Sequence, residues 1–155
     1  MQAEQKLKDL DINLPKIAEN NDLPFSTKGV IVDKLVYLSG QTTMIDGEMK
    51  ITGTVGSAVT VEIAQEAAEV CTLNLISALK DLIGDLNKVK RIVKLTGYVA
   101  SDKDFDQQAK VINGASNLLN SVFGGETPHA RAAIGVAALP GGTSVEAEMI
   151  VELNT

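Results

Sequence analysis

The sequence predicts an α+β fold, with a mixed β-sheet and two long helices packed on one of its faces. Apolar residues recur at intervals of three and four over residues 61–83 and 105–123, which is the period of an amphipathic helix. Aliphatic and β-branched runs of strand length occupy residues 29–32, 35–39 and 89–100. The order strands, helix, strand, helix, strands is typical of helices layered on a sheet.

Turn residues separate these elements. Asp33-Lys34 joins the first two strands as a hairpin, and Asp46-Gly47 is a strong tight-turn signal within residues 44–52. Gly84 is placed to end the first long helix, and Gly124-Gly125 to end the second.

The patterns also predict which side chains face inward. Residues 2–10 form a short polar helix with Leu7 and Leu10 inward, ended near Pro15. In the long strand we expect one face to carry Val93, Leu95, Gly97 and Val99. Cys71 lies in the apolar stripe of the first long helix, as a small buried hydrophobic residue.

The segment from His129 to Leu153 is predicted to be a β-hairpin. Its turn is Leu139-Pro140-Gly141-Gly142, and from Val145 onward apolar residues alternate with mainly acidic ones. A symmetric turn would place three residues on one face of this hairpin, namely Arg131, Ala133 and Glu146. One face would then offer a permanent cation and a carboxylate, with small residues that leave room for a ligand.

Length and composition limit the class of protein. We expect residues 1–155 to form a single domain with residues 1–22 as a helical N-terminal extension. A net charge of −6 disfavours nucleic-acid partners. No stretch of 18 apolar residues and no signal peptide are present, so we expect no membrane partner. One cysteine fits a reducing, cytoplasmic compartment.

Four features in order resemble the reactive-intermediate deaminase (Rid, YjgF-like) family. They are Ser39-Gly40-Gln41 after a strand, Asn113 in Val-Ile-Asn-Gly-Ala-Ser, Arg131 before a strand ending in Leu139-Pro140, and Glu146 fifteen residues after the arginine. The likeness covers nearly the whole chain after about residue 20. It implies a chorismate-mutase-like (YjgF-like) fold and a homotrimer with clefts between subunits.

The resemblance also implies roles for these residues. Arg131 would grip a substrate carboxylate with its planar fork, and Glu146 would position water near the substrate nitrogen. The alternatives are a structural arginine paired with a glutamate, and a solvated strand glutamate. Asn113 either hydrogen-bonds the ligand or caps local backbone, and Ser39 is either a ligand contact or a strand-end serine. His129, a one-residue insertion relative to the family pattern, is either a surface loop residue or a proton carrier.

Two positions depart from the deaminases proper. Ala133 stands where they carry a cysteine, and Phe25 and Ser26 stand where they carry a tyrosine. Phe25 keeps the aromatic bulk but lacks the hydroxyl. The carboxylate-binding residues are therefore kept, whereas the water-handling residues are incomplete. No cluster has metal-ligand spacing and no phosphate-binding loop is present, so we expect neither metal nor cofactor.

These observations give a leading hypothesis and two rivals. The first is a protein that binds a small carboxylate, a 2-oxo acid or an imine, and hydrolyses enamine or imine intermediates to 2-oxo acids and ammonia. The second is a non-catalytic module that binds or senses the same metabolite. The third is an endoribonuclease or translation inhibitor, which the acidic charge and the lack of a basic, aromatic patch disfavour.

Overall fold

The computed structural model describes residues 2–17, 25–125 and 128–154 and has the predicted α+β composition. The described residues form helices α1 (Ala3–Asp9), α2 (Val61–Ile83) and α3 (Gln108–Phe123), with 3-10 turns η1 (Leu86–Lys88) and η2 (Pro140–Gly142). The strands are β1 (Gly29–Val32), β2 (Leu35–Leu38), β3 (Met44–Ile45), β4 (Glu48–Met49), β5 (Val89–Ala100), β6 (Ala130–Val136) and β7 (Val145–Leu153).

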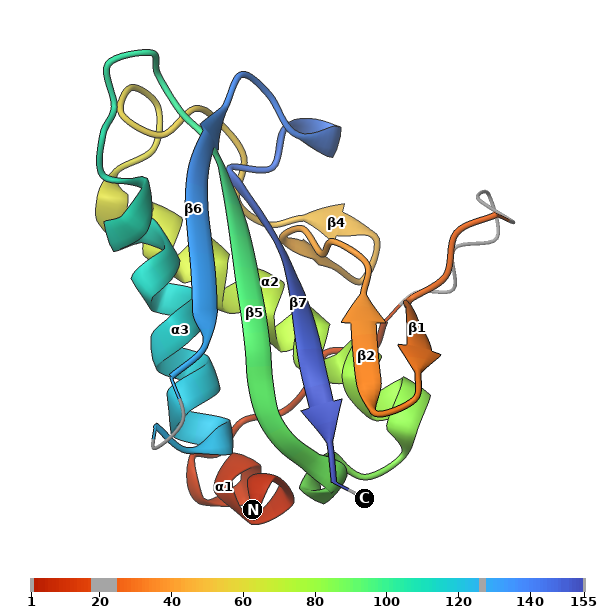
Figure 1. Cartoon of the computed structure of the whole chain (residues 1–155). Coiled ribbons are helices and arrows are strands. Elements are labelled where there is room, and N and C mark those ends of the chain that lie inside the picture. Colours follow the sequence, from red (N-terminus) through yellow and green to blue (C-terminus); the bar gives the residue numbers. More distant parts are fainter. Residues whose placement is uncertain (1, 18–24, 126–127, 155) are drawn as a thin grey trace.

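The main sheet has five strands in the order β1-β2-β7-β5-β6, and α2 and α3 both lie on one of its faces (Figure 1). All neighbouring strands are antiparallel except β5 and β6, which are parallel and are joined through α3. β3 and β4 form a separate two-stranded ribbon around the predicted turn, where Asp46 and Gly47 have φ of 52° and 77°.

The predicted C-terminal hairpin is wrong. β6 and β7 are not neighbours, because β5 lies between them, parallel to β6 and antiparallel to β7 (Figure 1). The segment 137–144 therefore passes over the end of β5, with Gly141 and Gly142 at φ of 61° and 74°. Alternating apolar residues identified both strands correctly, but alternation does not specify a partner. The 12-residue β5 offers an edge to each of them.

Helix α2 has local signals at both of its ends. The backbone N–H of Ile63 donates to the Thr60 hydroxyl, which caps α2, and Gly84 ends α2 with φ of 79°. α3 begins at Gln108 rather than at Phe105. Phe105 belongs to a preceding turn, because its backbone N–H donates to Asp102 and its carbonyl accepts from the Gln108 side chain at 2.7 Å.

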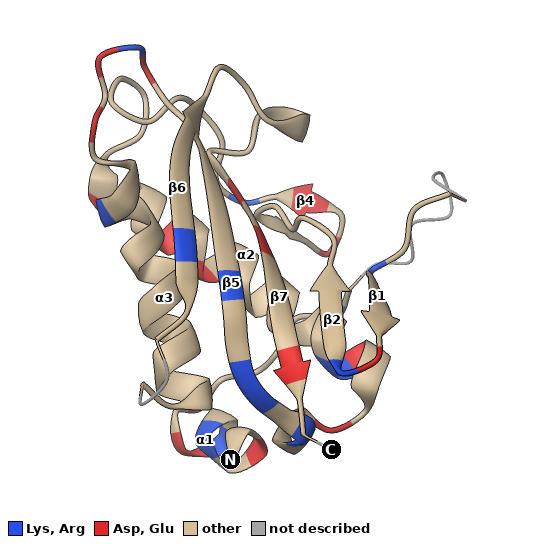
Figure 2. Cartoon of the chain, viewed as in Figure 1, with Lys and Arg blue, Asp and Glu red and all other residues tan. Residues whose placement is uncertain are grey.

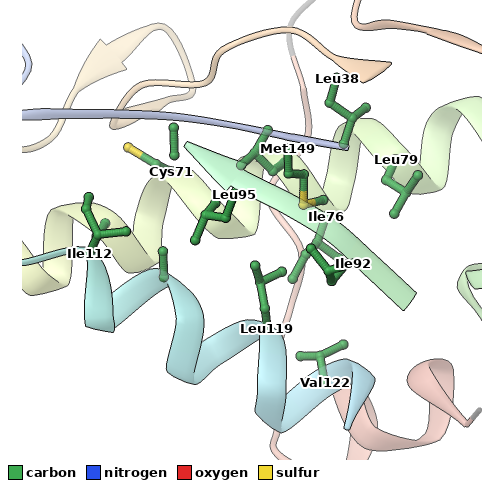
Figure 3. Close-up of a cluster of buried hydrophobic side chains, with 14 of the residues drawn as sticks. Leu38, Cys71, Ile76, Leu79, Ile92, Leu95, Ile112, Leu119, Val122 and Met149 are labelled. Atoms are coloured by element: carbon green, nitrogen blue, oxygen red, sulfur yellow. The ribbon is translucent and has the colours of Figure 1, made fainter. Parts of the chain in front are cut away.

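The core lies between the sheet and the two helices (Figure 3). Two glycines allow its close packing: a Cβ at Gly114 would collide with the backbone of Gln65, where α3 crosses α2, and a Cβ at Gly97 would collide with Ile112. The core residues labelled in Figure 3 are Leu38, Cys71, Ile76, Leu79, Ile92, Leu95, Ile112, Leu119, Val122 and Met149. Cys71 is fully buried, as predicted.

The expected inward face of β5 needs one correction. Leu95, Gly97 and Val99 are buried, but Ile92 is buried in place of Val93. The register between β5 and β7 shifts between Ile92 and Lys94, so Val93 is an extra residue at a β-bulge. The shift resets the alternation of the strand.

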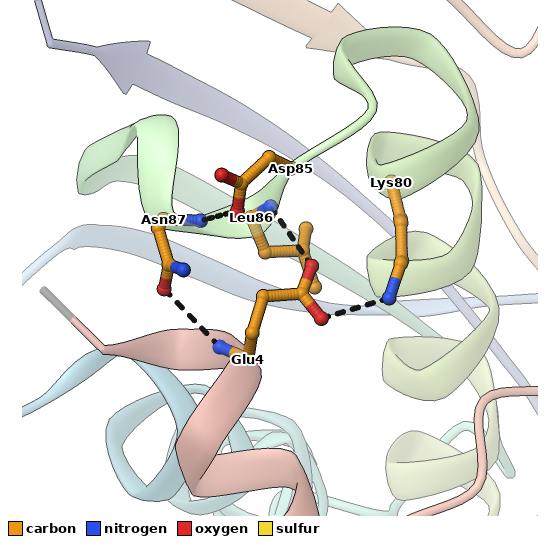
Figure 4. A network of polar contacts seen from close by, with 5 residues as sticks. All are labelled: Glu4, Lys80, Asp85, Leu86 and Asn87. Carbon is orange, nitrogen blue, oxygen red and sulfur yellow. Dashed lines mark hydrogen bonds and ion pairs between the residues drawn. The ribbon is translucent and has the colours of Figure 1, made fainter.

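The N-terminal helix is tied to the end of α2 by a polar network (Figure 4). The Glu4 carboxylate accepts from Lys80 Nζ at 2.8 Å and from the backbone N–H of Leu86 at 3.1 Å. The backbone N–H of Glu4 in turn donates to the Asn87 side chain. Leu7 is buried as predicted, whereas Leu10 is 47% exposed because α1 ends before it.

Among the helices of the described residues, none is both long and apolar enough to cross a membrane.

Candidate functional site

Arg131 lies on the edge strand β6, on the face of the sheet that α3 covers. Arg131 pairs with Leu95 on the neighbouring strand β5, and Leu95 is buried in the core. Paired residues point to the same face of the sheet. It is the one basic residue of β6 (Figure 2). Its guanidinium contacts α3 at three points: Nη1 donates to Asn113 Oδ1 at 2.9 Å and to Ser116 Oγ at 3.2 Å, and Nη2 donates to the Ala109 carbonyl at 3.3 Å.

These contacts leave part of the guanidinium available. An arginine side chain has five N–H groups and no acceptor. Three hydrogen bonds are made, and neither Nε–H nor the second N–H of Nη2 has a partner among the described residues. Nε and Nη2 lie along one edge of the planar group, and such an edge can meet both oxygens of a carboxylate. No acidic residue in the described part of the chain forms an ion pair with Arg131.

Ser116 and His129 extend this group of residues. Ser116 Oγ lies 3.0 Å from His129 Nε2, in addition to its contact with Arg131. His129 is partly buried just before β6, and burial together with the Arg131 charge lowers its pKa. We call Arg131, Asn113, Ser116 and His129 the arginine cluster. Sequence reasoning missed Ser116, although its position three residues after Asn113 on the same helix face was a usable signal.

Glu146 lies on the opposite face of the sheet. It pairs with Tyr98 of β5, and the residues before and after it, Val145 and Ala147, are buried toward the helices. Its carboxylate lies over Gly40, where a Cβ would come within 2.5 Å of Oε1, so a larger residue there would displace the Glu146 side chain.

The segment that faces Glu146 is fixed by backbone and side-chain hydrogen bonds. Gln41 exchanges two backbone hydrogen bonds with Ala147, at 2.8 and 3.0 Å. Asn74 of α2 donates to the carbonyls of Thr42 and Met44, at 2.9 and 2.8 Å. Ser39 donates its hydroxyl hydrogen to the Thr27 carbonyl, so toward a ligand it can act as an acceptor.

Several of these residues line an open groove. Glu146, Ser39, Gly40 and Gln41 form part of its lining, and we call them the glutamate cluster. Ser26, Thr27, Lys28 and the segment 12–17 after α1 also line the groove. Phe25 is 84% exposed and does not line the groove.

The electrostatics of Glu146 favour its neutral form. Burial raises the pKa of this carboxyl, and the nearby charge of Glu148 raises it further. Glu148 in turn accepts from the Tyr98 hydroxyl at 2.9 Å, which raises the pKa of Tyr98. A carboxyl whose pKa is shifted toward neutrality can act as a general base or acid.

The predicted site residues therefore fall into two clusters. The structure brings Arg131 to Asn113 and His129, and it brings Glu146 to Ser39, but it does not bring the two clusters together. Ala133 shares the face of Arg131, because it pairs with Gly97 two residues along β5. The predicted common face for Arg131, Ala133 and Glu146 is thus wrong for Glu146, since it depended on the hairpin that does not form. The described residues contain no group of three His, Cys, Asp or Glu side chains that could hold a metal ion.

Comparison with known proteins agrees with this architecture. The family model described as "YjgF/chorismate_mutase-like, putative endoribonuclease" matches residues 4–152. Protein TCP17 of Trypanosoma cruzi is 46% identical over 120 residues, which are 77% of this chain and 75% of that protein.

Solved structures extend the comparison. The protein Atu1372 of Agrobacterium tumefaciens, whose function is described as unknown, is 45% identical with a TM-score of 0.87, over 98% of this chain and 92% of that one. RidA from an Antarctic Psychrobacter species is 25% identical with a TM-score of 0.60, over 90% of this chain and 93% of that one. The chain belongs to the YjgF/chorismate-mutase-like family.

Proposed function

We propose that this protein binds a small carboxylate, a 2-oxo acid or the related imine, at Arg131. The observation that carries the proposal is a guanidinium that α3 holds by three hydrogen bonds, with Nε–H and one N–H of Nη2 left without a partner among the described residues. A positioned fork loses little freedom when it binds, so its two remaining donors favour a planar anion. Asn113 acts here by holding the arginine rather than by direct contact with the ligand.

The complete site forms between two subunits of a homotrimer. Arg131 and Glu146 face opposite sides of one sheet, so a ligand that meets both needs a second copy of the chain. The sheet face that the helices leave uncovered is partly apolar and includes Val30, Val32, Tyr37 and Ile134, each between 44% and 53% exposed. Burial of such an apolar face against another copy of the chain would favour association of the subunits. The resemblance to the Rid family implies the same arrangement.

The reaction that suits this site is hydrolysis of an imine. Arg131 of one subunit holds the carboxylate while Glu146 of the next subunit takes a proton from water. The oxygen of that water bonds to the imine carbon and the first proton passes to nitrogen, which gives a carbinolamine. The remaining hydroxyl proton then passes to the same nitrogen as the C–N bond breaks, which gives a 2-oxo acid and ammonia. The imine carbon is already electrophilic, so positioning supplies much of the rate. The raised pKa of Glu146 suits proton transfer in both directions.

A non-catalytic binding module is the second candidate, and Ala133 favours it. The deaminases proper carry a cysteine at that position, and Phe25, at the tyrosine position, lies outside the groove. Ribonuclease activity, named in the family description, is disfavoured by the net charge of −6.

Two measurements on the purified protein test these functions. Calorimetry with 2-oxobutanoate should show binding, and Arg131→Ala should abolish it. Freshly generated 2-aminoacrylate should be converted to pyruvate and ammonia faster than it decays in buffer. Binding without turnover would select the binding module, whereas absence of carboxylate binding would overturn both functions.

A further inference from the structure

Ser116 forms a hydrogen-bond relay between the single histidine of the chain and the candidate carboxylate site. Because a guanidinium only donates, Ser116 Oγ must accept from Arg131 Nη1. The one hydrogen of the hydroxyl is then free to point at His129 Nε2, which lies 3.0 Å away. When the hydroxyl donates in this way, Nε2 is the acceptor and His129 is neutral, with its proton on Nδ1; in the other tautomer Nε2–H would donate to Ser116 Oγ.

Protonation of His129 would reverse the direction of the hydrogen bond between Ser116 and His129. Nε2–H would become a donor to Ser116 Oγ, and the hydroxyl would receive two hydrogen bonds from two cations. The imidazolium would also stand two hydrogen bonds from a fixed positive charge. The field of Arg131 therefore opposes protonation while the guanidinium carries no anion.

We propose that His129 belongs to the carboxylate site and takes up a proton from solvent when a carboxylate binds to Arg131, with Ser116 as the hydrogen-bonded link between the two residues. A bound carboxylate cancels the charge that opposes the imidazolium, so protonation of His129 becomes more favourable than in the ligand-free protein. The inference rests on the proposed function, because it assumes that the anion binds at Arg131. The sequence predicted one cation in this site, Arg131. Protonated His129 would be a second cation, which forms when the carboxylate binds.

The sign of the effect follows from this arrangement. Without ligand, burial first and the Arg131 charge second lower the pKa of His129. Neutralising Arg131 removes the second of these effects, so carboxylate binding raises the pKa. By linkage, protonation of His129 must strengthen carboxylate binding by the same factor. Carboxylates should therefore bind more tightly at about pH 5 than at pH 8.

The surroundings of His129 contain few other charges that could produce this behaviour. On β6 the charged residue is Arg131, and on α3 the contacting residue, Ser116, is uncharged. On β5, the charged residue in this part of the strand is Lys94, which pairs with Ala130. In the sequence, Glu126 precedes His129 by three residues and lies outside the described residues, so Glu126→Gln serves as a control.

The experiment follows the imidazole directly, because the chain has one histidine and its ring signal needs no assignment. The pKa of His129 is measured by NMR titration of the full-length protein, with and without saturating 2-oxobutanoate. We expect the ligand to raise the pKa. In Arg131→Ala the pKa without ligand should already be raised and should not respond to 2-oxobutanoate. In Ser116→Ala the response should shrink, whereas in Glu126→Gln it should persist.

Calorimetry supplies the reciprocal measurement and separates the hypotheses. Affinity for 2-oxobutanoate should rise toward acid pH, by about tenfold for each unit of pKa change. This dependence should vanish in His129→Gln and remain in Glu146→Gln, which excludes Glu146 as its source. Binding with no change in the His129 pKa would overturn the relay and leave the proposed function standing. Failure of 2-oxobutanoate and of acetate to bind would overturn both.

Discussion

Arg131 and Glu146 lie on opposite faces of one sheet, on strands that both pair with β5. Arg131 occupies the row of Leu95, which is buried against the helices, and Glu146 occupies the row of Tyr98, three residues further along β5. Side chains alternate along a strand, so an odd separation puts the two rows on different faces. One copy of the chain therefore cannot direct both side chains at the same small ligand.

Mixed assemblies should reveal whether two subunits share a site. We expect Arg131→Ala and Glu146→Gln to be inactive alone but to regain part of the turnover when the two variants are co-expressed. In a mixed trimer, some clefts combine the intact arginine of one subunit with the intact glutamate of its neighbour. The measurement is imine hydrolysis by mixtures isolated with two affinity tags. Mixed assemblies that are as inactive as their parents would overturn the shared site.

Arg131→Lys should weaken carboxylate binding almost as much as Arg131→Ala. A lysine keeps the charge but cannot donate to Asn113, to Ser116 and to both oxygens of a carboxylate. Loss of a hydrogen-bonded charge partner typically costs about 2–5 kcal/mol of binding free energy. Calorimetry with 2-oxobutanoate measures the effect, and Lys94→Ala on the neighbouring strand is the control for loss of a positive charge elsewhere. Wild-type affinity in Arg131→Lys would show that Arg131 contributes its positive charge alone and not the geometry of its guanidinium.

Gly114→Ala should destabilise the fold although alanine favours helices. The added Cβ would collide with the Gln65 backbone, so α3 would have to move away from α2. Overpacking of this kind costs about 1–3 kcal/mol, against a gain of about 1 kcal/mol in helix propensity. Denaturant unfolding measures the difference, with the exposed Asn120→Ala on the same helix as the control. Equal or greater stability in Gly114→Ala would show that the helices separate freely.

Local sequence patterns predicted the elements well because the determining interactions are local. Val61–Ile83 has the period of a helix with Gly84 at its end, and α2 has these limits. The Asp46-Gly47 turn needs two positive φ angles, and both are present. The fold class followed from the order of such elements.

The partners of the last two strands could not be predicted in the same way. The turn residues at Pro140–Gly142 fit a hairpin, but they also fit a connection that passes over the end of β5. The choice depends on where the long β5 lies, which is a non-local contact. The bulge at Val93 and the contact of Ser116 with His129 have the same origin, because both depend on neighbours distant in the sequence.

The stability of Glu146→Gln should depend on pH. The folded chain raises the pKa of Glu146 above 4.5, so the fold favours the neutral carboxyl. Below this ordinary value the carboxyl is neutral in both states, and the variant and the wild type should unfold alike. As the pH rises through the folded pKa, the wild type must ionise a half-buried group and loses stability.

Thermal unfolding at about pH 4 and pH 7 tests this expectation. Glu146→Gln should have the higher Tm at neutral pH, with the difference disappearing in acid. Glu48→Gln is a control of opposite sign, because the hydrogen bond from Lys50 lowers the pKa of Glu48. A Glu146→Gln variant that is less stable at neutral pH would mean that the carboxylate has a stabilising partner in the assembled protein.

Turnover should have an acid limb set by Glu146. A general base must be ionised, so activity should rise with pH through the raised pKa of this carboxyl. Glu146→Gln should lose about 10²–10⁴ of the rate while carboxylate binding persists. Because the charge of Glu148 contributes to the raised pKa, Glu148→Gln should move the acid limb to lower pH and keep the plateau. The measurement is a pH profile of kcat/KM on fresh 2-aminoacrylate, and an acid limb that Glu148→Gln leaves unmoved would assign it to another group.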